Sequence, residues 1–451
     1  MAATIKVVYL FASVIVFIKS CAAENEPELV FANLIWRHGS RSALYSYPSD
    51  PYNNKPIWPQ GPGQLTQVGM RQEYELGRFF RQRYGKLLSE EYKRSEIYIR
   101  STDVDRTLMS AECNIAALYP PSGRQKWNGT NTTWQPIPVH TIPVETDYLL
   151  RFPLHDCPKY SELSSQIVHS PIYQKIEEKY APFLKELANF TQWDGTMNIK
   201  AAWDVEDALV CEKAANLALP SWVTDDRLKK LNEIAGIDMG VLFGGTNPGY
   251  QVKIAKAGGA GLLVKAILDN IQRAIDFENT YKVVAYSAHD TTLSALLNAL
   301  HAYNMRPPPF ASAILFEVYK QASADKTSYF VKTFYRNSTV NPALPLSVLG
   351  CSFACPFEEL KQRAVSVIPV DIDKECERTE VPPSTPACTA SSTSAENELQ
   401  LIFTNVICRH GLRSPLKPIF SDQNMDPKDA GQLTKVGMQQ QYELGCFFRQ
   451  K

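Results

Sequence analysis

Apolar and polar positions follow the same order at three places along the chain: a strand-like apolar run, a polar cluster, and a stretch with helical periodicity. The apolar runs are residues 29–36, 96–99 and 282–286, and the polar clusters that follow them are residues 37–41, 100–106 and 287–290. This alternation predicts an α/β fold: a mainly parallel sheet with helices on both faces. Ligands of such sheets bind beyond the carboxyl ends of the strands, where all three clusters would lie.

A long segment without this pattern separates the second and third junctions. Much of it, roughly residues 160–237, has the periodicity of helices. We therefore expect an insertion that forms a smaller helical cap, over roughly residues 130–260.

The chain also contains an internal repeat. LVFANLIWRHG at 29–39 matches LIFTNVICRHG at 401–411, and GQLTQVGMRQEYELGRFFRQR at 63–83 matches GQLTKVGMQQQYELGCFFRQK at 431–451. The offset predicts one complete domain over 24–376, a Ser/Thr/Pro-rich linker over 377–397 and a truncated second copy over 398–451. The second copy has no counterpart of the clusters at 100–106 and 287–290, so we expect it to be catalytically silent.

The N-terminus has the pattern of a secretory signal peptide, residues 1–23. Lys6 precedes an apolar run over residues 7–18, and small residues follow that run. A run of this length is too short to span a bilayer, which needs roughly 20 residues, and we expect no membrane anchor elsewhere. The Asn-X-Ser/Thr sequons that agree with secretion are Asn128, Asn131, Asn189 and Asn337.

Charge balance and cysteine content indicate which partners, bonds and cofactors to expect. The chain has 47 Lys and Arg against 47 Asp and Glu, and this balance gives no support for a nucleic-acid partner. Ten cysteines in an oxidising compartment predict disulfides. The chemistry-bearing clusters carry no Cys/His spacing typical of metal sites, so we expect neither a metal nor another cofactor.

The first polar cluster, Arg37-His38-Gly39-Ser40-Arg41, has residue types suited to phosphoryl transfer. Arginine guanidinium groups match phosphate oxygens in a bidentate way. A neutral imidazole can attack phosphorus and carry the phosphoryl group, and a glycine lets the backbone approach a ligand closely. The alternative is an Arg-His pair that caps a surface helix.

The other two clusters would complete such a site. Arg106 begins a predicted helix, whose N-terminus favours anions, although it could instead pair with Asp103 or Asp105 at the surface. His289 could bond a phosphate oxygen, and Asp290 could protonate a leaving alkoxide as a general acid. The alternative for Asp290 is a simple helix cap. Without a metal, the arginines would have to supply the positive charge.

Five segments together resemble the histidine acid phosphatases, in the branch of the prostatic and lysosomal enzymes. They are RHGSR at 37–41, WPQGPGQLTQVGM at 58–70, YIRSTDVDRTLMSA at 98–111, WQPIPVHT at 134–141 and YSAHDTT at 286–292. The resemblance covers roughly residues 28–376. It implies a metal-independent acid phosphatase that cleaves small phosphate monoesters through a phosphohistidine. It further implies a secreted or lysosomal protein, and some family members form homodimers.

The resemblance also implies the role of each site residue. His38 resembles the nucleophile and Asp290 the proton donor. The residues that resemble phosphate ligands are Arg37, Arg41, Arg106 and His289. The implied disulfides are Cys157–Cys376 and Cys351–Cys355, the latter also favoured by its short C-x3-C spacing.

Three positions depart from the family pattern. Ala43 replaces a proline, and Ser40 replaces an acidic residue, so Arg41 lacks a local partner. Cys211 matches a family disulfide position, but its expected partner position holds Ala313, so we expect Cys211 to be unpaired.

Two other functions stay open at this point. A phytase-like enzyme for inositol phosphates would favour a lysine-rich pocket mouth. A non-catalytic secreted protein that binds phosphorylated ligands would need neither nucleophile nor acid, whereas His38 and Asp290 are both present.

Overall fold

The computed structural model describes residues 26–378, except residues 130, 132, 155, 246, 278–280 and 324–325. The expected signal peptide, nearly all of the linker and the second copy lie outside the described residues. The strands are β1 (Glu28–Arg37), β2 (Ile97–Ser101), β3 (Val283–Ala288), β4 (Ala313–Ala322), β5 (Thr327–Arg336), β6 (Leu344–Leu346) and β7 (Ala354–Pro356). The α-helices are α2 (Gln67–Tyr84), α3 (Asp105–Leu118), α4 (Pro158–Val168), α5 (Pro171–Thr191), α6 (Ile199–Ala214), α7 (Asp225–Leu242), α8 (Pro248–Ala257), α9 (Ala260–Asp276), α10 (Asp290–Ala299), α11 (Phe357–Ala364) and α12 (Ile372–Glu375).

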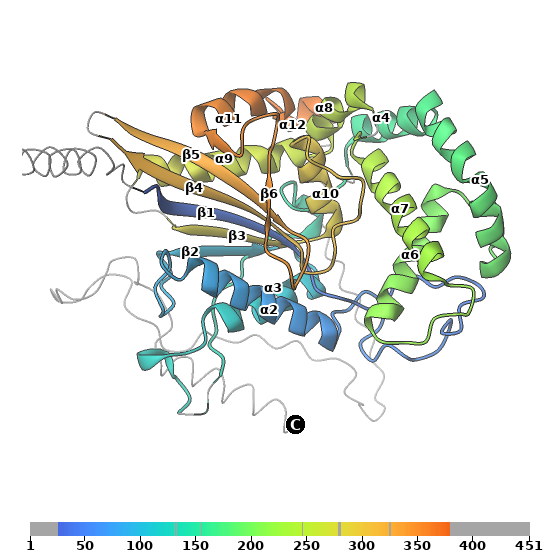
Figure 1. Ribbon diagram of the computed structural model, residues 1–451, viewed down its shortest axis with the longest axis horizontal. Coiled ribbons are helices and arrows are strands. Elements are labelled where there is room, and N and C mark those ends of the chain that lie inside the picture. The colour runs from blue at the N-terminus through green and yellow to red at the C-terminus, as the bar shows by residue number, and fades with distance from the viewer. Residues whose placement is uncertain are drawn as a thin grey trace, which may run out of the picture.

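The strands form one mixed sheet in the order β2-β3-β1-β4-β5-β6, with β7 paired to β5 (Figure 1). The three strands of the predicted junctions, β1, β2 and β3, run parallel, and α3 and α10 follow two of them as expected. Strands β4 to β7 add an antiparallel half that the junction pattern did not include. No helix separates β4 from β5, and strands joined by a short hairpin must be antiparallel. The predicted α/β class is confirmed.

Strand β1 is buried on both faces, and this explains its nearly continuous apolar sequence. Phe31 and Ile35 belong to the apolar core that includes α9 and α10. Ala32, Leu34 and Trp36 point to the opposite face and belong to the core shared with α2 and α3. Helices therefore cover both faces of the sheet, as Figure 1 shows.

Helices α4 to α7 occupy the segment in which the sequence pattern predicted helices, and α5 to α7 lie to one side of the sheet (Figure 1). Ser170, Asn198 and Thr224 start α5, α6 and α7, because their side chains accept hydrogen bonds from backbone N–H groups of the first turn. The buried residues of α4 to α7 belong to the same apolar core as α9 and α10. The boundaries of a separate cap domain stay a prediction.

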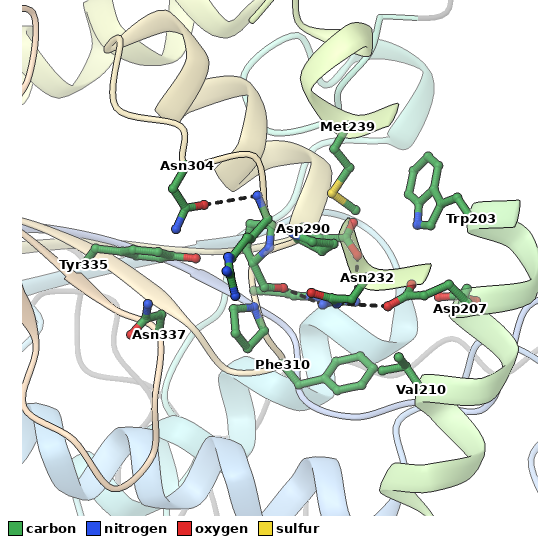
Figure 2. Close-up of a pocket in the computed structure, with 16 residues that line it drawn as sticks. Trp203, Asp207, Val210, Asn232, Met239, Asp290, Asn304, Phe310, Tyr335 and Asn337 are labelled. Atoms are coloured by element: carbon green, nitrogen blue, oxygen red, sulfur yellow. Dashed lines mark hydrogen bonds and ion pairs between the residues drawn. The ribbon is translucent and has the colours of Figure 1, made fainter. Parts of the chain in front are cut away.

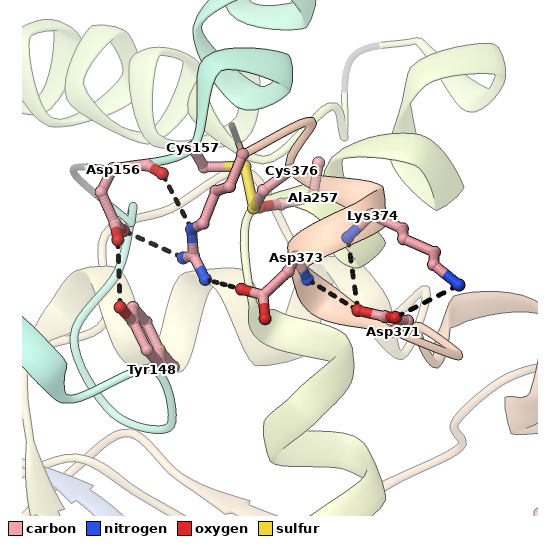
Figure 3. Close-up of a disulfide and its surroundings, with 9 residues drawn as sticks. Tyr148, Asp156, Cys157, Ala257, Asp371, Asp373, Lys374 and Cys376 are labelled. Carbon is pink, nitrogen blue, oxygen red and sulfur yellow. Dashed lines mark hydrogen bonds and ion pairs between the residues drawn. A yellow bond between two sulfur atoms is a disulfide. The ribbon is translucent and has the colours of Figure 1, made fainter. Parts of the chain in front are cut away.

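The described residues contain two disulfides, which join the cysteines expected to pair, Cys157 with Cys376 and Cys351 with Cys355. The first bond connects the residue before α4 to the end of α12 (Figure 3). Beside it, the Arg378 guanidinium donates to Asp156 and Asp373. Within the described ranges, Cys211 is unpaired, as expected, and no helix is long and apolar enough to cross a bilayer.

Candidate active site

The three polar clusters meet at the carboxyl edge of the parallel strands. The His38 N–H donates to the Ala288 carbonyl at 2.9 Å, and the Thr102 N–H donates to the Ser287 carbonyl at 3.2 Å. The chain therefore keeps the ends of β1, β2 and β3 in register just beyond the sheet. This arrangement brings the predicted site residues of distant segments to one place.

His38 is buried, with 1% of its surface exposed, which excludes the surface-cap interpretation. Its Nδ1 lies 2.8 Å from the Gly39 carbonyl oxygen. Because a carbonyl oxygen only accepts hydrogen bonds, we assign the proton to Nδ1, and this leaves a lone pair on Nε2. Burial lowers the pKa of His38 well below its usual range, and the charges of Arg106 and Arg37 lower it further. The imidazole is therefore neutral, as a nucleophile must be.

The turn that carries His38 packs directly on the first turn of α2. A Cβ atom on Gly39 would lie 2.4 Å from the Gly69 carbonyl oxygen, and one on Gly69 would lie 2.1 Å from the Ser40 carbonyl oxygen. Thr66, the N-cap of α2, donates its hydroxyl to that same Ser40 oxygen at 2.9 Å. Both glycines are required by this close approach, so the turn has little freedom to move.

Arg37 and Asp290 form an ion pair between the end of β1 and the start of α10. The Arg37 Nη2 atom lies 2.6 Å from Asp290 Oδ2, and Nη1 donates to the Pro308 carbonyl at 2.6 Å. His289 is the N-cap of α10, so Asp290 is its first helical residue and not its cap. Burial raises the pKa of Asp290, but Arg37 and Arg41 outweigh this effect and leave it below its usual value.

Arg41 has a partner that the sequence did not reveal. Its two terminal nitrogens donate to the two oxygens of Asp207, on α6, at 2.6 and 3.1 Å. Cys211, one turn later on α6, also lies beside this guanidinium. The acidic partner missing at Ser40 is thus replaced by a carboxylate from the helical insertion.

Arg106 is the second residue of α3, and its Nη2 lies 3.3 Å from His289 Nδ1. A guanidinium only donates, so Nδ1 accepts, and His289 Nε2 donates to the Thr102 hydroxyl at 3.0 Å. Burial, then Arg106, lowers the pKa of His289 well below its usual range. In the part of the chain that the structure describes, no ion pair joins Arg106 to Asp103 or Asp105.

A cavity of about 340 Å³ opens beside the Arg37–Asp290 pair (Figure 2). Trp203, Asp207 and Val210 of α6 lie on one side of it, and Phe310 lies in the loop that closes another side. The centroid of the Phe310 ring lies 4.2 Å from the Arg37 guanidinium carbon. This cavity has room for the organic part of a substrate whose phosphate contacts the strand ends.

Two further residues belong to the site, and no motif in the sequence marks them. Arg151 adds a fourth guanidinium, whose charge further lowers the pKa of the buried His289 and that of the half-buried Arg106. The Thr292 hydroxyl of α10 donates to the Leu150 carbonyl at 2.7 Å and thereby holds this segment beside the site. Glu206 lines the cavity from α6. Only the tertiary packing brings Arg151 and Glu206 to the strand ends.

Among the residues that the structure describes, no group of three or more His, Cys, Asp or Glu side chains could hold a metal ion. The positive charge of the site comes from arginines. Such a site fits a phosphate group, because several guanidinium donors converge on one buried imidazole.

Solved structures share this fold at low sequence identity. The phytase from Citrobacter braakii matches with a TM-score of 0.58 at 15% identity, covering 77% of this chain and 99% of that chain. The Hafnia alvei phytase in complex with tartrate matches with a TM-score of 0.58 at 16% identity, covering 80% and 100%. At these identities the likeness concerns the fold alone.

Sequence relatives are much more similar. A lysosomal acid phosphatase from Xenopus laevis is 43% identical over 367 residues, 81% of this chain and 83% of the relative. Human prostatic acid phosphatase is 43% identical over 350 residues, 77% of this chain and 88% of the relative. The family model described as "Histidine phosphatase superfamily (branch 2)" matches residues 28–336. The fold, the histidines at the strand ends and the similarity to these relatives all lead to the same family. The chain belongs to branch 2 of the histidine phosphatase superfamily.

Proposed function

We propose that this protein is an acid phosphatase that hydrolyses small phosphate monoesters through a phosphohistidine on His38. One observation carries the proposal: His38 is buried among arginine side chains with its Nδ1 against the Gly39 carbonyl oxygen, and this contact leaves Nε2 without a proton. Arginine donors fix the phosphate and stabilise the charge of its oxygens in the transition state. Arg37, Arg41 and Arg106 hold the phosphate in this proposal, and His289 joins them when its Nε2–H turns from the Thr102 hydroxyl to a phosphate oxygen.

In the first step, His38 Nε2 attacks phosphorus, and the bond from phosphorus to the leaving oxygen breaks. Asp290 gives its proton to that oxygen, so a neutral alcohol departs. In the second step, Asp290 takes a proton from water while the water oxygen attacks the phosphohistidine. The products are inorganic phosphate, a free His38 and a protonated Asp290.

Asp290 needs a proton when the substrate is bound, although Arg37 favours its ionised form in the free site. A bound phosphate places a second anion beside the same guanidinium. Like charges raise the pKa of a carboxyl, so substrate binding itself favours the protonated acid.

The cavity favours this activity over a phytase-like one. The acids Glu206, Asp207 and Asp290 line it, and none of its described lining residues is a lysine. An inositol that carries several phosphates would need cationic partners for each of them, and the described lining of the cavity offers only Arg37 and Arg306. A single phosphate with a neutral organic group needs no such additional cations.

The test is turnover of a phosphate monoester panel, with and without EDTA, by the natural chain and by His38→Ala. We expect EDTA to have no effect and His38→Ala to abolish turnover. When the reaction with radiolabelled substrate is quenched rapidly without acid, a phosphoenzyme with its label on His38 should be recovered. Retained binding of phosphate without any turnover by the natural chain would favour the non-catalytic alternative.

We also propose that residues 1–23 direct the protein to secretion or to lysosomes and that it is glycosylated. Asn128, Asn131 and Asn189 are exposed, and this supports their use as acceptors. Asn337 is half-buried and lines the cavity, so a glycan there would stand at the substrate entrance. A homodimer, as in some family members, stays a prediction that sedimentation would test.

A further inference from the structure

Glu206 is a buried acid in the wall of the cavity, and the proposed reaction does not use it. It lies on α6 with 5% of its surface exposed, and the same cavity is lined by Asp290 and Arg37. Asn232 of α7 donates its amide to Glu206 Oε1 at 3.1 Å. Among the described residues, no cationic side chain forms an ion pair with Glu206.

The surroundings of Glu206 favour its neutral form in acid. The charged and titratable groups that act on it are Asp207 and Cys211 on α6, Arg37 at the end of β1, and Asp290 on α10. Arg306 lines the same cavity. Burial, with Asp207 and Asp290, raises the pKa of Glu206 to about 7, while Asn232 and Arg37 oppose this rise. Glu206 is therefore a carboxylic acid under acidic conditions and becomes an anion above neutrality.

We infer that Glu206 is a specificity-determining residue that contacts the organic group of the substrate as a neutral carboxylic acid. Its O–H then donates to a hydroxyl, ether or nitro oxygen of that group without adding charge to the cavity. Once ionised, it places a negative charge beside an anionic substrate and beside Asp290, and the substrate binds less well. This inference rests on the proposed phosphatase function, since it concerns the same cavity.

The experiment compares kcat/KM of the natural chain, Glu206→Gln and Asp204→Asn from about pH 5 to about pH 8. The substrate is 4-nitrophenyl phosphate, and kcat and KM are separated at each pH. Glutamine keeps the shape and still accepts from Asn232, but it does not ionise. Asp204 is the matched control, because it lies on α6, pairs with Lys200 and does not line the cavity.

We expect kcat/KM of the natural chain to fall, relative to Glu206→Gln, by up to about tenfold per pH unit above about pH 7. The loss should appear in KM. The second ionisation of the substrate phosphate, near pH 6, is common to all three proteins and cancels in the ratio. Asp204→Asn should follow the natural chain.

Parallel profiles of the natural chain and Glu206→Gln would overturn this inference and leave the proposed function intact. A chain without turnover at about pH 5 would instead overturn the proposed function, and the inference with it. If Glu206→Gln does not fold, Asn232→Leu provides the same test. Removal of the amide that opposes the pKa rise should move the fall in kcat/KM to higher pH. An unmoved fall would also overturn the inference.

Discussion

Arg41 and Asp207 are 166 residues apart in the sequence and form a bidentate ion pair at the strand edge, with N···O distances of 2.6 and 3.1 Å. Helix α6 thus holds a proposed phosphate ligand in place through a carboxylate. A phosphate that binds Arg41 has to share this guanidinium with Asp207. The pair therefore couples the helical insertion to phosphate binding.

Asp207→Asn should destabilise the free protein and strengthen its response to phosphate. Removal of one partner of a buried pair typically costs about 3–5 kcal/mol, and we expect the lower end because the Asp207 side chain is 19% exposed. Bound phosphate replaces the missing charge, so added phosphate should raise Tm more in Asp207→Asn than in the natural chain. Thermal unfolding with and without phosphate measures both effects. Equal increases in Tm for the two proteins would show that phosphate does not bind Arg41.

Asp290→Asn should distinguish a general acid from a structural residue. Asparagine keeps the shape but does not donate a proton to a leaving alkoxide, which is a strong base. We expect turnover of alkyl phosphates to fall by about 10²–10⁴-fold, and turnover of nitrophenyl phosphate to fall much less. Steady-state kinetics on both substrates is the measurement. Equal losses on the two substrates, with folding intact, would remove Asp290 from the acid role.

Arg151→Gln should weaken substrate binding through charge alone. Its guanidinium lies close enough to Arg106 and His289 to lower the pKa of both groups. We expect KM to rise about tenfold, which corresponds to about 1.4 kcal/mol, with a smaller rise at high salt because ions screen the interaction. Lys86→Gln, at an exposed position on the same protein, is the control and should leave KM unchanged. A KM that is insensitive to Arg151→Gln would contradict the assignment of Arg151 to the site.

The neutral, buried His38 should make the phosphate-free protein less stable in acid. The folded pKa of His38 lies below the unfolded value near 6.5, so below that pH the unfolded chain binds a proton that the folded protein does not. Stability that is present above about pH 6.5 is therefore lost as the pH falls, by about 1.4 kcal/mol per pH unit until the folded pKa is reached. His38→Gln should remove the share of this decline that His38 contributes in urea unfolding between about pH 7 and about pH 5, whereas His289, whose pKa is lowered in the same way, keeps its own share. His169→Gln, at an exposed histidine, should leave the decline unchanged.

Loss of the Cys157–Cys376 bond should destabilise the domain without changing the site. The bond joins residues 219 positions apart, and removal of a native disulfide typically costs about 2–5 kcal/mol. We expect the double variant Cys157→Ser/Cys376→Ser to unfold at lower urea concentration, with unchanged KM at temperatures where it stays folded. The second disulfide closes a loop of only a few residues, and its removal should cost less. A larger loss of stability in Cys351→Ser/Cys355→Ser than in Cys157→Ser/Cys376→Ser would contradict this prediction.

The position of His38, Arg106 and Asp290 could be predicted because local patterns determine it. Each follows or begins an element that alternation of apolar and polar residues already marks, and parallel strands end at one edge. The same local logic applies to Gly39, whose backbone contact with Gly69 involves two motif segments. The sequence by itself thus determined the strand–helix order and the side chains at the edge of the sheet.

Only the tertiary structure decided what those side chains meet. Asp290 pairs with Arg37, and Arg41 pairs with Asp207. Glu206 and Arg151 reach the site from segments that carry no motif of phosphoryl transfer. These contacts depend on how α6 and the loop before α4 pack against the strand ends. Such packing joins residues that are far apart in the chain. The strength of these contacts depends on burial and charge in the folded state, and no local pattern in the sequence records either of them.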